Sequence, residues 1–295
     1  MLDVRRLQAL REVARTGSIA AAARELRFTP SAVSQQLAKL ERETGVALLE
    51  RGAQSVRLTS AGRALAEHAE AILARLELAE AELHGVAAHP LRVVAFPSVA
   101  SALVPAALAE LDAPVEITQA DPLESVPQVV RGRVDVALVY EYDHVPLELD
   151  PGLERDLVLE EPLHVLLPGG HPAARRRSVQ LPELAEESWI QSTSRSACHP
   201  FTVRICRAAG FEPKIALSFD DYRAMQSLVA SGAGIALVPE MSLAPLHEGV
   251  VARPVAFRPP RRRIYAVYRP PLPPAGEGFV RAVRSAVAEE ERVAG

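Results

Sequence analysis

The stretch TGSIAAAARELRFTPSAVSQQLAKLERETG, residues 16–45, limits the fold of this chain more than any other feature. It predicts two short helices joined by a tight connection. Ser18 is a good N-cap for the alanine-rich run after it, and Thr29 caps again with Pro30 at the first helical position, where a missing N–H costs nothing. Gly45 then ends the second helix. Two short helices linked in this way are typical of a helix-turn-helix.

The second of these helices has an apolar face formed by Val33, Leu37 and Leu40, which leaves its polar face toward solvent. Glutamine can pair with an adenine edge and hydroxyls can reach bases or phosphates, so we expect this face to enter the major groove of double-stranded promoter DNA. The alternative is a small helical bundle whose polar face only meets water. The predicted DNA contacts are Thr29, Pro30, Ser31, Ser34, Gln35, Lys39 and Arg42.

The segments 48–51 and 56–59 flank a short turn that holds Gly52, and they predict a two-stranded wing. Arg51 and Arg57 stand on the two strands, where they could reach phosphate or the minor groove. We therefore add both arginines to the DNA-binding residues.

A long helix is predicted from residue 60 to about residue 88. Its apolar positions are spaced alternately four and three residues apart, a 3.5-residue repeat that specifies a coiled-coil seam. We expect this helix to form a dimer, and the alternative is an amphipathic helix lying on its own domain. The predicted dimerisation residues are Leu65, Ala69, Ile72, Leu76, Ala79 and Leu83.

Beyond residue 90 the pattern changes to short Val/Leu/Ile/Ala runs that alternate with helical stretches. Strand, helix and strand at these lengths indicate parallel βαβ units. Two arginine triplets, residues 175–177 and 261–263, are interpreted as solvated loops. The predicted strands are residues 91–96, 115–119, 134–140, 164–167, 189–192, 215–219, 235–238 and 263–268.

Composition narrows the class of protein. The chain has 295 residues, 48% of them hydrophobic, with no apolar run long enough for a membrane span and no signal or transit peptide pattern. We therefore expect a cytoplasmic protein without membrane contact.

The charges are distributed unevenly along the chain. Residues 1–63 carry eleven basic and six acidic side chains, whereas the remainder carries 22 basic and 31 acidic ones. A basic head on an acidic body fits a local DNA footprint.

These residues carry a specific resemblance. The opening L-x-x-L-x-x-V at Leu7, Leu10 and Val13, the helix-turn-helix stretch and LLERGAQSVRLTSAG resemble the DNA-binding domain of LysR-type transcriptional regulators. The resemblance continues through the long helix and the βαβ lobes. Leu49 stands where the family usually has Phe, and the turn at 52–55 is less basic than usual, which places more weight on Arg51 and Arg57.

The resemblance implies a winged helix-turn-helix domain at 1–60, a linker helix at 61–88, and a two-lobed α/β sensor domain similar to periplasmic binding proteins at 91–295. Lobe I would comprise about 91–161 and 265–295, and lobe II about 162–264. A small-molecule effector would bind between the lobes. Homodimers would join into homotetramers, and effector binding would change promoter bending and the access of RNA polymerase.

The strand pattern places two polar segments at this cleft, because ligands gather at the carboxyl ends of parallel strands. Hydroxyls and free N–H groups at a helix start favour a small carboxylate as the effector. The alternative is that these residues are N-caps and nothing more. The predicted effector-binding residues are Pro97, Ser98, Val99, Ser101, Gln191, Ser192, Thr193 and Ser194.

Two alternatives stay open. Peroxide-sensing members of the family use two cysteines in the neighbourhood of Cys198 and Cys206, which would make this chain a redox sensor. The chain could also be an α/β enzyme with a helical N-terminal extension, although no G-x-S-x-G, P-loop or HExxH motif occurs. We expect no catalytic residues, no metal site and no cofactor.

Overall fold

The computed structural model describes residues 2–51, 56–84, 90–143, 145–193, 196, 199–257 and 259–294, with the backbone alone at 51, 77–78, 81–84 and 289–294. The chain divides into two compact units. The N-terminal unit comprises residues 1–90 and 130–134, and the C-terminal unit comprises the remainder. Each unit has its own hydrophobic core.

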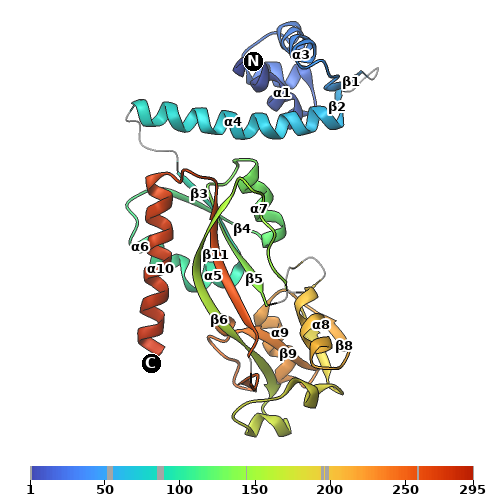
Figure 1. Cartoon of the computed structure of the whole chain (residues 1–295), viewed down its shortest axis with the longest axis vertical. Coiled ribbons are helices and arrows are strands. Elements are labelled where there is room, and N and C mark those ends of the chain that lie inside the picture. Colours follow the sequence, from blue (N-terminus) through green and yellow to red (C-terminus); the bar gives the residue numbers. More distant parts are fainter. Residues whose placement is uncertain are drawn as a thin grey trace. The chain divides into compact units, whose positions relative to one another are not determined.

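The N-terminal unit is built from helices and a small hairpin (Figure 1). Its predicted helix ends are confirmed: the side chains of Ser18 and Thr29 accept the amide hydrogens of Ala21 and Ala32, and Gly45 adopts a left-handed φ of 69°. The elements are α1 (Val4–Thr16), α2 (Ile19–Glu25), α3 (Pro30–Thr44), β1 (Leu49–Arg51), β2 (Val56–Leu58) and α4 (Ser60–His84).

The hydrophobic core of this unit joins its helices. Leu7 and Leu10 of α1 and Leu37 of α3 are buried together, and α4 packs against α1. Gly62 near the start of α4 is required there, because a Cβ would lie 2.1 Å from the carbonyl oxygen of Leu48. The wing strands pair antiparallel, from Leu49 opposite Leu58 to Arg51 opposite Val56.

The C-terminal unit contains one hydrogen-bonded sheet with the order β4-β3-β5-β11-β6-β9-β7-β8, and β10 pairs with β6. Its strands are β3 (Leu91–Ala95), β4 (Val115–Gln119), β5 (Val136–Tyr142), β6 (Glu154–Pro168), β7 (Ser188–Gln191), β8 (Lys214–Ser218), β9 (Ile235–Pro239), β10 (Val250–Pro254) and β11 (Arg261–Tyr268). Its helices are α5 (Pro97–Ala102), α6 (Val104–Ala109), α7 (Pro122–Val130), α8 (His199–Ala208), α9 (Tyr222–Ala230) and α10 (Pro274–Ala294). Short 3₁₀ turns lie at η1 (Pro172–Arg175), η2 (Leu181–Leu184) and η3 (Glu240–Ser242).

Two parallel βαβ arrangements stand on either side of a pair of long antiparallel strands. In lobe I, β3 pairs in parallel with β4 and β5, and in lobe II, β7 pairs in parallel with β8 and β9. Strand β6 pairs with β11 up to Pro162 and with β9 and β10 from Leu163 onward, so it passes through both lobes. Figure 1 shows β6 and β11 running side by side along this unit.

The sequence predictions for three strands need correction here. Only residues 164–167 of β6 were predicted as a strand, and β10 was missed. Residues 261–263 are not a solvated loop but the first part of β11, paired with β5 and β6. Between β3 and β4 the chain forms two short helices, α5 and α6.

Candidate functional site

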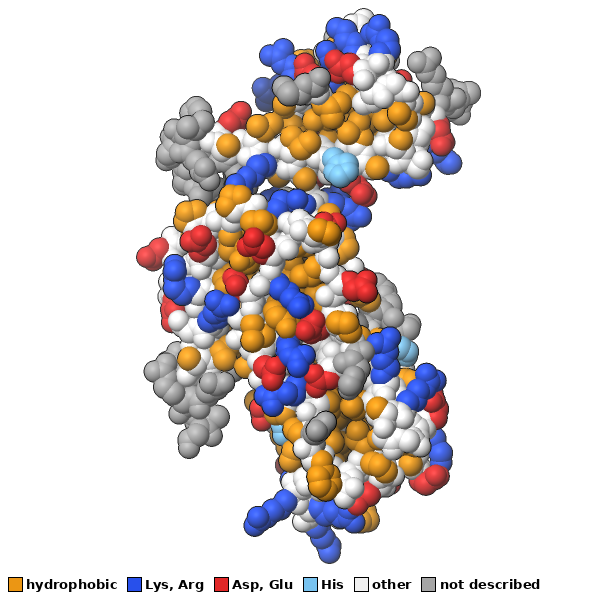
Figure 2. All heavy atoms as spheres, viewed as in Figure 1, with side chains coloured by type: hydrophobic (Ala, Val, Ile, Leu, Met, Phe, Trp, Pro, Cys, Tyr) orange, Lys and Arg blue, Asp and Glu red, His pale blue; other side chains and the backbone are white. Residues whose placement is uncertain are grey.

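Helix α3 presents a continuous polar face. Its apolar residues Val33, Leu37 and Leu40 are at most 1% exposed, so they fix the helix on the domain core. The polar residues predicted to contact DNA all lie on the exposed side: Thr29, Pro30, Ser31, Ser34, Gln35, Lys39 and Arg42. Figure 2 shows blue basic side chains gathered over this end of the N-terminal unit.

Three of these side chains already have local partners. The hydroxyls of Thr29 and Ser31 lie 3.0 Å apart, and Arg42 donates to the carbonyl oxygen of Ala38 at 3.3 Å. Both bonds are short-range and exposed, so they orient the side chains without withdrawing them from solvent. The face can offer hydroxyl, amide and cationic groups to a nucleic acid.

The wing is anchored to α3 by one carboxylate. Glu41 accepts the backbone N–H groups of Leu48 and Leu49 at 2.8 and 3.1 Å, which fixes the start of the hairpin relative to the polar face of α3. Arg57 on β2 is exposed, as a phosphate contact requires. The side chain of Arg51 and the turn 52–55 lie outside the described residues.

The predicted seam on α4 divides into two parts. Ala69 is completely buried in the core of its own unit and Leu65 packs against that core, so Ala69 cannot contact a partner helix. Ile72 and Leu76 are 42% and 40% exposed, and Ala79 is exposed, which leaves an apolar stripe on the second half of the helix. Hydrophobic side chains form a band along α4 in Figure 2. The side chain of Leu83 lies outside the described residues.

The C-terminal unit holds a cavity of about 260 Å³, which we call the cleft. Most of its walls lie at or just beyond the carboxyl ends of β3, β4, β7 and β8, the usual place for a ligand in a parallel sheet. Its lining residues are Phe96, Pro97, Ser98, Gln119, Ala120, Asp121, Glu124, Tyr140, Ser192, Ser196, Asp220, Tyr222 and Arg262.

The structure brings three of the predicted effector residues into this cleft: Pro97, Ser98 and Ser192. Val99 instead lies in the hydrophobic core, and Ser101 is exposed and donates to the carbonyl oxygen of Ser98. These two predicted contacts are corrected, because neither side chain lines the cleft.

The remaining predicted residues support the opposite wall. Gln191 is buried behind the lining, where its amide nitrogen lies 3.1 Å from Nδ1 of His199. Thr193 donates its amide and its hydroxyl to Asp220 at 2.9 and 2.6 Å. Ser194 lies outside the described residues.

The expected anion site at the start of α5 also needs correction. Helix α5 has only six residues and begins at Pro97, which has no N–H to offer. The positive charge beside Ser98 comes from Arg262, whose Nη2 donates to the Ser98 hydroxyl oxygen at 3.2 Å. Positive charge therefore enters the cleft through a side chain of β11.

Arg262 is 1% exposed and is held by an almost completely buried carboxylate. Its Nε and Nη2 lie 2.7 and 2.5 Å from one oxygen of Glu161, directly opposite on β6. The other Glu161 oxygen accepts the amide of Met241 in lobe II. Burial alone would lower the pKa of Arg262, but the charge and hydrogen bond of Glu161, together with Tyr142 and Tyr222, raise the pKa above its ordinary value. The guanidinium is permanently charged.

Aromatic rings and one serine complete the middle of the cleft. The Arg262 guanidinium lies 5.1 Å from the centre of the Phe96 ring and 5.6 Å from that of Tyr140. The Tyr140 hydroxyl donates to Asp121 at 2.6 Å and lies 3.2 Å from the hydroxyl of Ser196 in lobe II. These contacts hold the two walls together.

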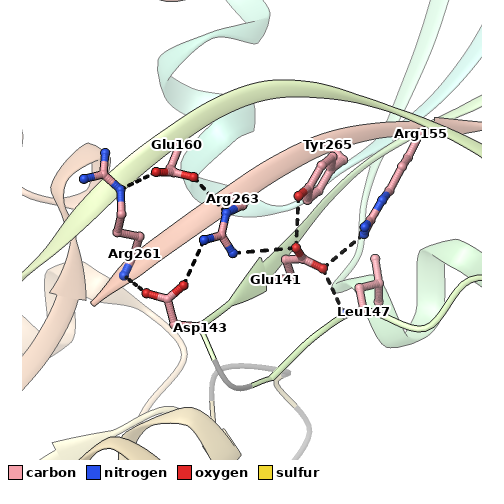
Figure 3. Close-up of polar contacts among 8 residues, drawn as sticks. All are labelled: Glu141, Asp143, Leu147, Arg155, Glu160, Arg261, Arg263 and Tyr265. Atoms are coloured by element: carbon pink, nitrogen blue, oxygen red, sulfur yellow. Dashed lines mark hydrogen bonds and ion pairs between the residues drawn. The ribbon is translucent and has the colours of Figure 1, made fainter. Parts of the chain in front are cut away.

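The other face of β11 carries a different kind of polar cluster (Figure 3). Successive strand residues point to opposite faces, so Arg261 and Arg263 lie away from Arg262. Glu160 pairs with both of them, at 2.5 and 2.7 Å, and Arg263 also reaches Asp143 at 3.0 Å. These side chains are between 27% and 43% exposed, unlike Arg262.

The same cluster continues to Glu141 on β5. This carboxylate accepts the amide of Leu147, the hydroxyl of Tyr265 and Nη1 of Arg155 at 3.1, 2.9 and 3.1 Å. Burial alone would raise the pKa of Glu141, but these hydrogen bonds and the Arg155 charge lower it below its ordinary value. The cluster braces β5, β6 and β11 at the point where the lobes meet.

The chemistry of the cysteines is limited by burial. Cys206 lies in the hydrophobic core with no exposed surface, and burial raises the pKa of its thiol to about 12. Such a thiol forms almost no thiolate at neutral pH and is a poor nucleophile. Cys198 lies outside the described residues. In the part of the chain that the structure describes, no group of His, Cys, Asp and Glu is arranged to hold a metal ion.

Two family models match the chain. The model for the LysR substrate binding domain covers residues 84–288, and that for the bacterial regulatory helix-turn-helix protein of the lysR family covers residues 4–63. The chain belongs to the LysR family of transcriptional regulators. It is a DNA-binding regulator whose C-terminal unit is the effector-binding domain, as the resemblance implied.

Relatives of this LysR-type regulator agree with that assignment. The small neutral protease regulatory protein of Streptomyces coelicolor is 32% identical over 289 residues, with 94% of this chain and 89% of the relative covered. A full-length OxyR variant from Pseudomonas aeruginosa has the same fold, with a TM-score of 0.75, 21% identity, and 96% and 95% coverage. The regulator CbnR in complex with its target DNA gives a TM-score of 0.62 at 25% identity, with 97% and 100% coverage. No described helix of this regulator is long and apolar enough to cross a membrane.

Proposed function

We propose that the cleft binds the small-molecule effector of this regulator, and that α3 reads the promoter. The observation that carries the proposal is a 260 Å³ cavity to which lobe I contributes Ser98, lobe II contributes Ser192, and β11 contributes Arg262. A ligand that contacts both lobes stabilises one relative arrangement of them, and differential binding of this kind shifts the population of a regulator. The regulator needs no cofactor and catalyses no reaction in this proposal.

DNA recognition is assigned to the exposed face of α3, with Arg57 as a phosphate contact. Dimers form through the apolar stripe of Ile72, Leu76 and Ala79 on α4, and dimers associate into tetramers. Two α3 helices per dimer then read the two halves of one promoter site. The solved complex of CbnR with its target DNA supports this mode of action.

A redox function through two cysteines receives less support than effector binding. Burial raises the pKa of the Cys206 thiol to about 12, which disfavours the thiolate that peroxide chemistry requires. The regulator OxyR of Escherichia coli is 28% identical to this chain over 302 residues, with 96% of this chain and 95% of the relative covered. It is therefore the burial of Cys206 that disfavours redox sensing. We therefore propose ligand binding as the signal.

The test fills the cleft. Gln119 is exposed and lines the cleft, so Gln119→Trp should fill the cleft without placing a large side chain in the hydrophobic core. Ser98 is a buried residue of the lining, and Ser98→Trp should also fill the cleft. Ser101→Trp is the matched control, because Ser101 lies on the same helix outside the lining. Calorimetry with the metabolites handled by the neighbouring genes should show binding to the wild type and the control only. Equal binding to all four proteins would place the effector elsewhere.

A further inference from the structure

The cleft lining carries one basic side chain, Arg262, and three acidic ones, Asp121, Glu124 and Asp220. Arg262 and Asp220 are not paired with each other. Arg262 enters the cleft from β11, and Asp220 enters it from the loop after β8. In the described part of the chain, the ion-pair partner of Arg262 is Glu161, and Asp220 has no basic partner. A ligand that carries both charges would satisfy both groups.

Arg262 retains unused donor capacity. Its hydrogen bonds come from Nε and Nη2, which contact Glu161, Ser98 and, at 4.0 Å, the sulfur of Met241. The described residues supply no acceptor for Nη1, whose two N–H groups suit a carboxylate. The Ser98 hydroxyl accepts from Arg262, so its own hydrogen remains for the same ligand group. This end of the cleft fits an anion.

Asp220 sets the opposite requirement. Thr193 donates one hydrogen bond to each of its oxygens, which fixes the carboxylate at the edge of the cleft. Each oxygen keeps a further lone pair for a donor. A ligand that is only an anion would be repelled by this carboxylate, whereas an ammonium group would form a charge-assisted hydrogen bond with it.

The size of the cleft excludes large ligands. Its volume of about 260 Å³ lies just below the range of drug-sized pockets, and its uncharged lining is polar at Gln119, Ser192 and Ser196. Flat aromatic cofactors and sugars with several rings do not fit such a volume. A compact molecule with two charged groups does.

We propose that the effector is a small zwitterion of the amino-acid class. Its carboxylate binds Nη1 of Arg262 and the Ser98 hydroxyl, and its ammonium group binds Asp220. The inference rests on the proposed function of the cleft, and it assigns Arg262 and Asp220 as the residues that determine ligand specificity.

The experiment titrates the full-length regulator with each of the twenty standard amino acids by calorimetry. Any amino acid that binds is then compared with its des-amino acid and its decarboxylated amine. We expect at least one amino acid to bind, and both analogues to bind about tenfold more weakly, because each has lost one charge-assisted hydrogen bond. Asp220→Asn should weaken the binding of the amino acid about tenfold and should not weaken that of the des-amino acid, because the repulsion of its carboxylate is removed. Asp112→Asn, at an exposed position outside the cleft, should change neither.

Arg262 is tested in a double variant, Glu161→Gln with Arg262→Gln, so that no unpaired charge is buried. This protein should lose the preference for the amino acid over its amine. The zwitterion proposal is overturned if none of the twenty binds, if des-amino acids bind as tightly, or if Asp220→Asn weakens both ligands equally. If a des-amino acid binds as tightly as the amino acid, and Gln119→Trp abolishes its binding, the zwitterion proposal is overturned but the cleft remains the effector site. An amino acid that binds Gln119→Trp normally would overturn the cleft itself.

Discussion

The recognition face of α3 and the cleft are both polar sites, but they are built in different ways. The α3 face comes from one continuous stretch of chain, and the side chains proposed to contact DNA are exposed and play little part in packing. The cleft is assembled from segments as distant as Phe96 and Arg262, and several of its polar groups are also buried structural partners. Binding and folding are therefore separable in α3 and coupled in the cleft.

The largest effects are expected on α4, which has one face buried in the core of its own unit and one exposed apolar stripe. Ile72→Glu places a charge in the proposed seam, so the dimer should dissociate and promoter binding should be lost while the N-terminal unit stays folded. Sedimentation velocity and circular dichroism measure the two properties. Ala69→Glu is the contrasting variant, since burial of its charge should unfold the N-terminal unit. An Ile72→Glu protein that keeps the wild-type assembly would remove α4 as the dimer contact.

The coupling of binding and folding in the cleft is tested next at Glu161. Glu161→Ala leaves the Arg262 charge buried without its partner, which should lower the free energy of unfolding by about 3–5 kcal/mol. Glu160→Ala removes a carboxylate from the opposite, more exposed face of the same strand and should cost about 1 kcal/mol or less. Urea unfolding monitored by fluorescence of Trp189 measures both. Equal losses would show that the two faces of β6 do not differ.

A smaller and more selective effect is expected at α3. Gln35→Ala should reduce the preference for the promoter over random duplex by about 1–3 kcal/mol and leave the free energy of unfolding unchanged. Arg57→Ala should weaken binding to every sequence and lower the salt slope by about one unit. Fluorescence anisotropy over a salt series separates the two. If Gln35→Ala weakens specific and random binding equally, α3 does not read base edges through this residue.

The smallest effect is expected at Cys206, where we predict no reaction. With a thiol pKa of about 12, less than one molecule in a thousand carries the thiolate at pH 8, and the thiol is also buried. Iodoacetamide should therefore leave Cys206 unmodified in the folded protein and alkylate it in urea, as peptide mass spectrometry can show. Rapid alkylation of the folded protein at pH 8 would restore the redox alternative.

The contrast between the two sites also decides what could be predicted from sequence. The ends of α3 follow from neighbouring residues, Thr29, Pro30 and Gly45, so its start was predicted to the residue and its end to within one residue. The repeat on α4 was recognised, but a 3.5-residue spacing does not say which positions face the protein's own core, and Ala69 was misassigned. The family and fold were predictable because they depend on many such local signals.

The cleft was only partly predictable because its polar residues are explained by partners far away in the chain. The apolar pattern of β6 is interrupted by Glu160, Glu161 and Pro162. The arginine triplet 261–263 interrupts the pattern of β11 in the same way, so both strands were predicted too short. Each charge is acceptable in a strand only because the other strand supplies its counter-charge. The alternation of Arg262, Ile264 and Ala266 on one face was the signal that could have identified Arg262.

Strand β6 has a mechanical consequence. It crosses from lobe I to lobe II without a break, hydrogen-bonded first to β11 and then to β9 and β10. A paired ribbon tolerates torsion, because strands already twist, but a sharp bend would break its ladder. We therefore expect any movement of one lobe against the other to be a small twist along β6 and β11 rather than a bend. An effector bound beside Arg262, as proposed above, would change the relative angle at which the two lobes rest.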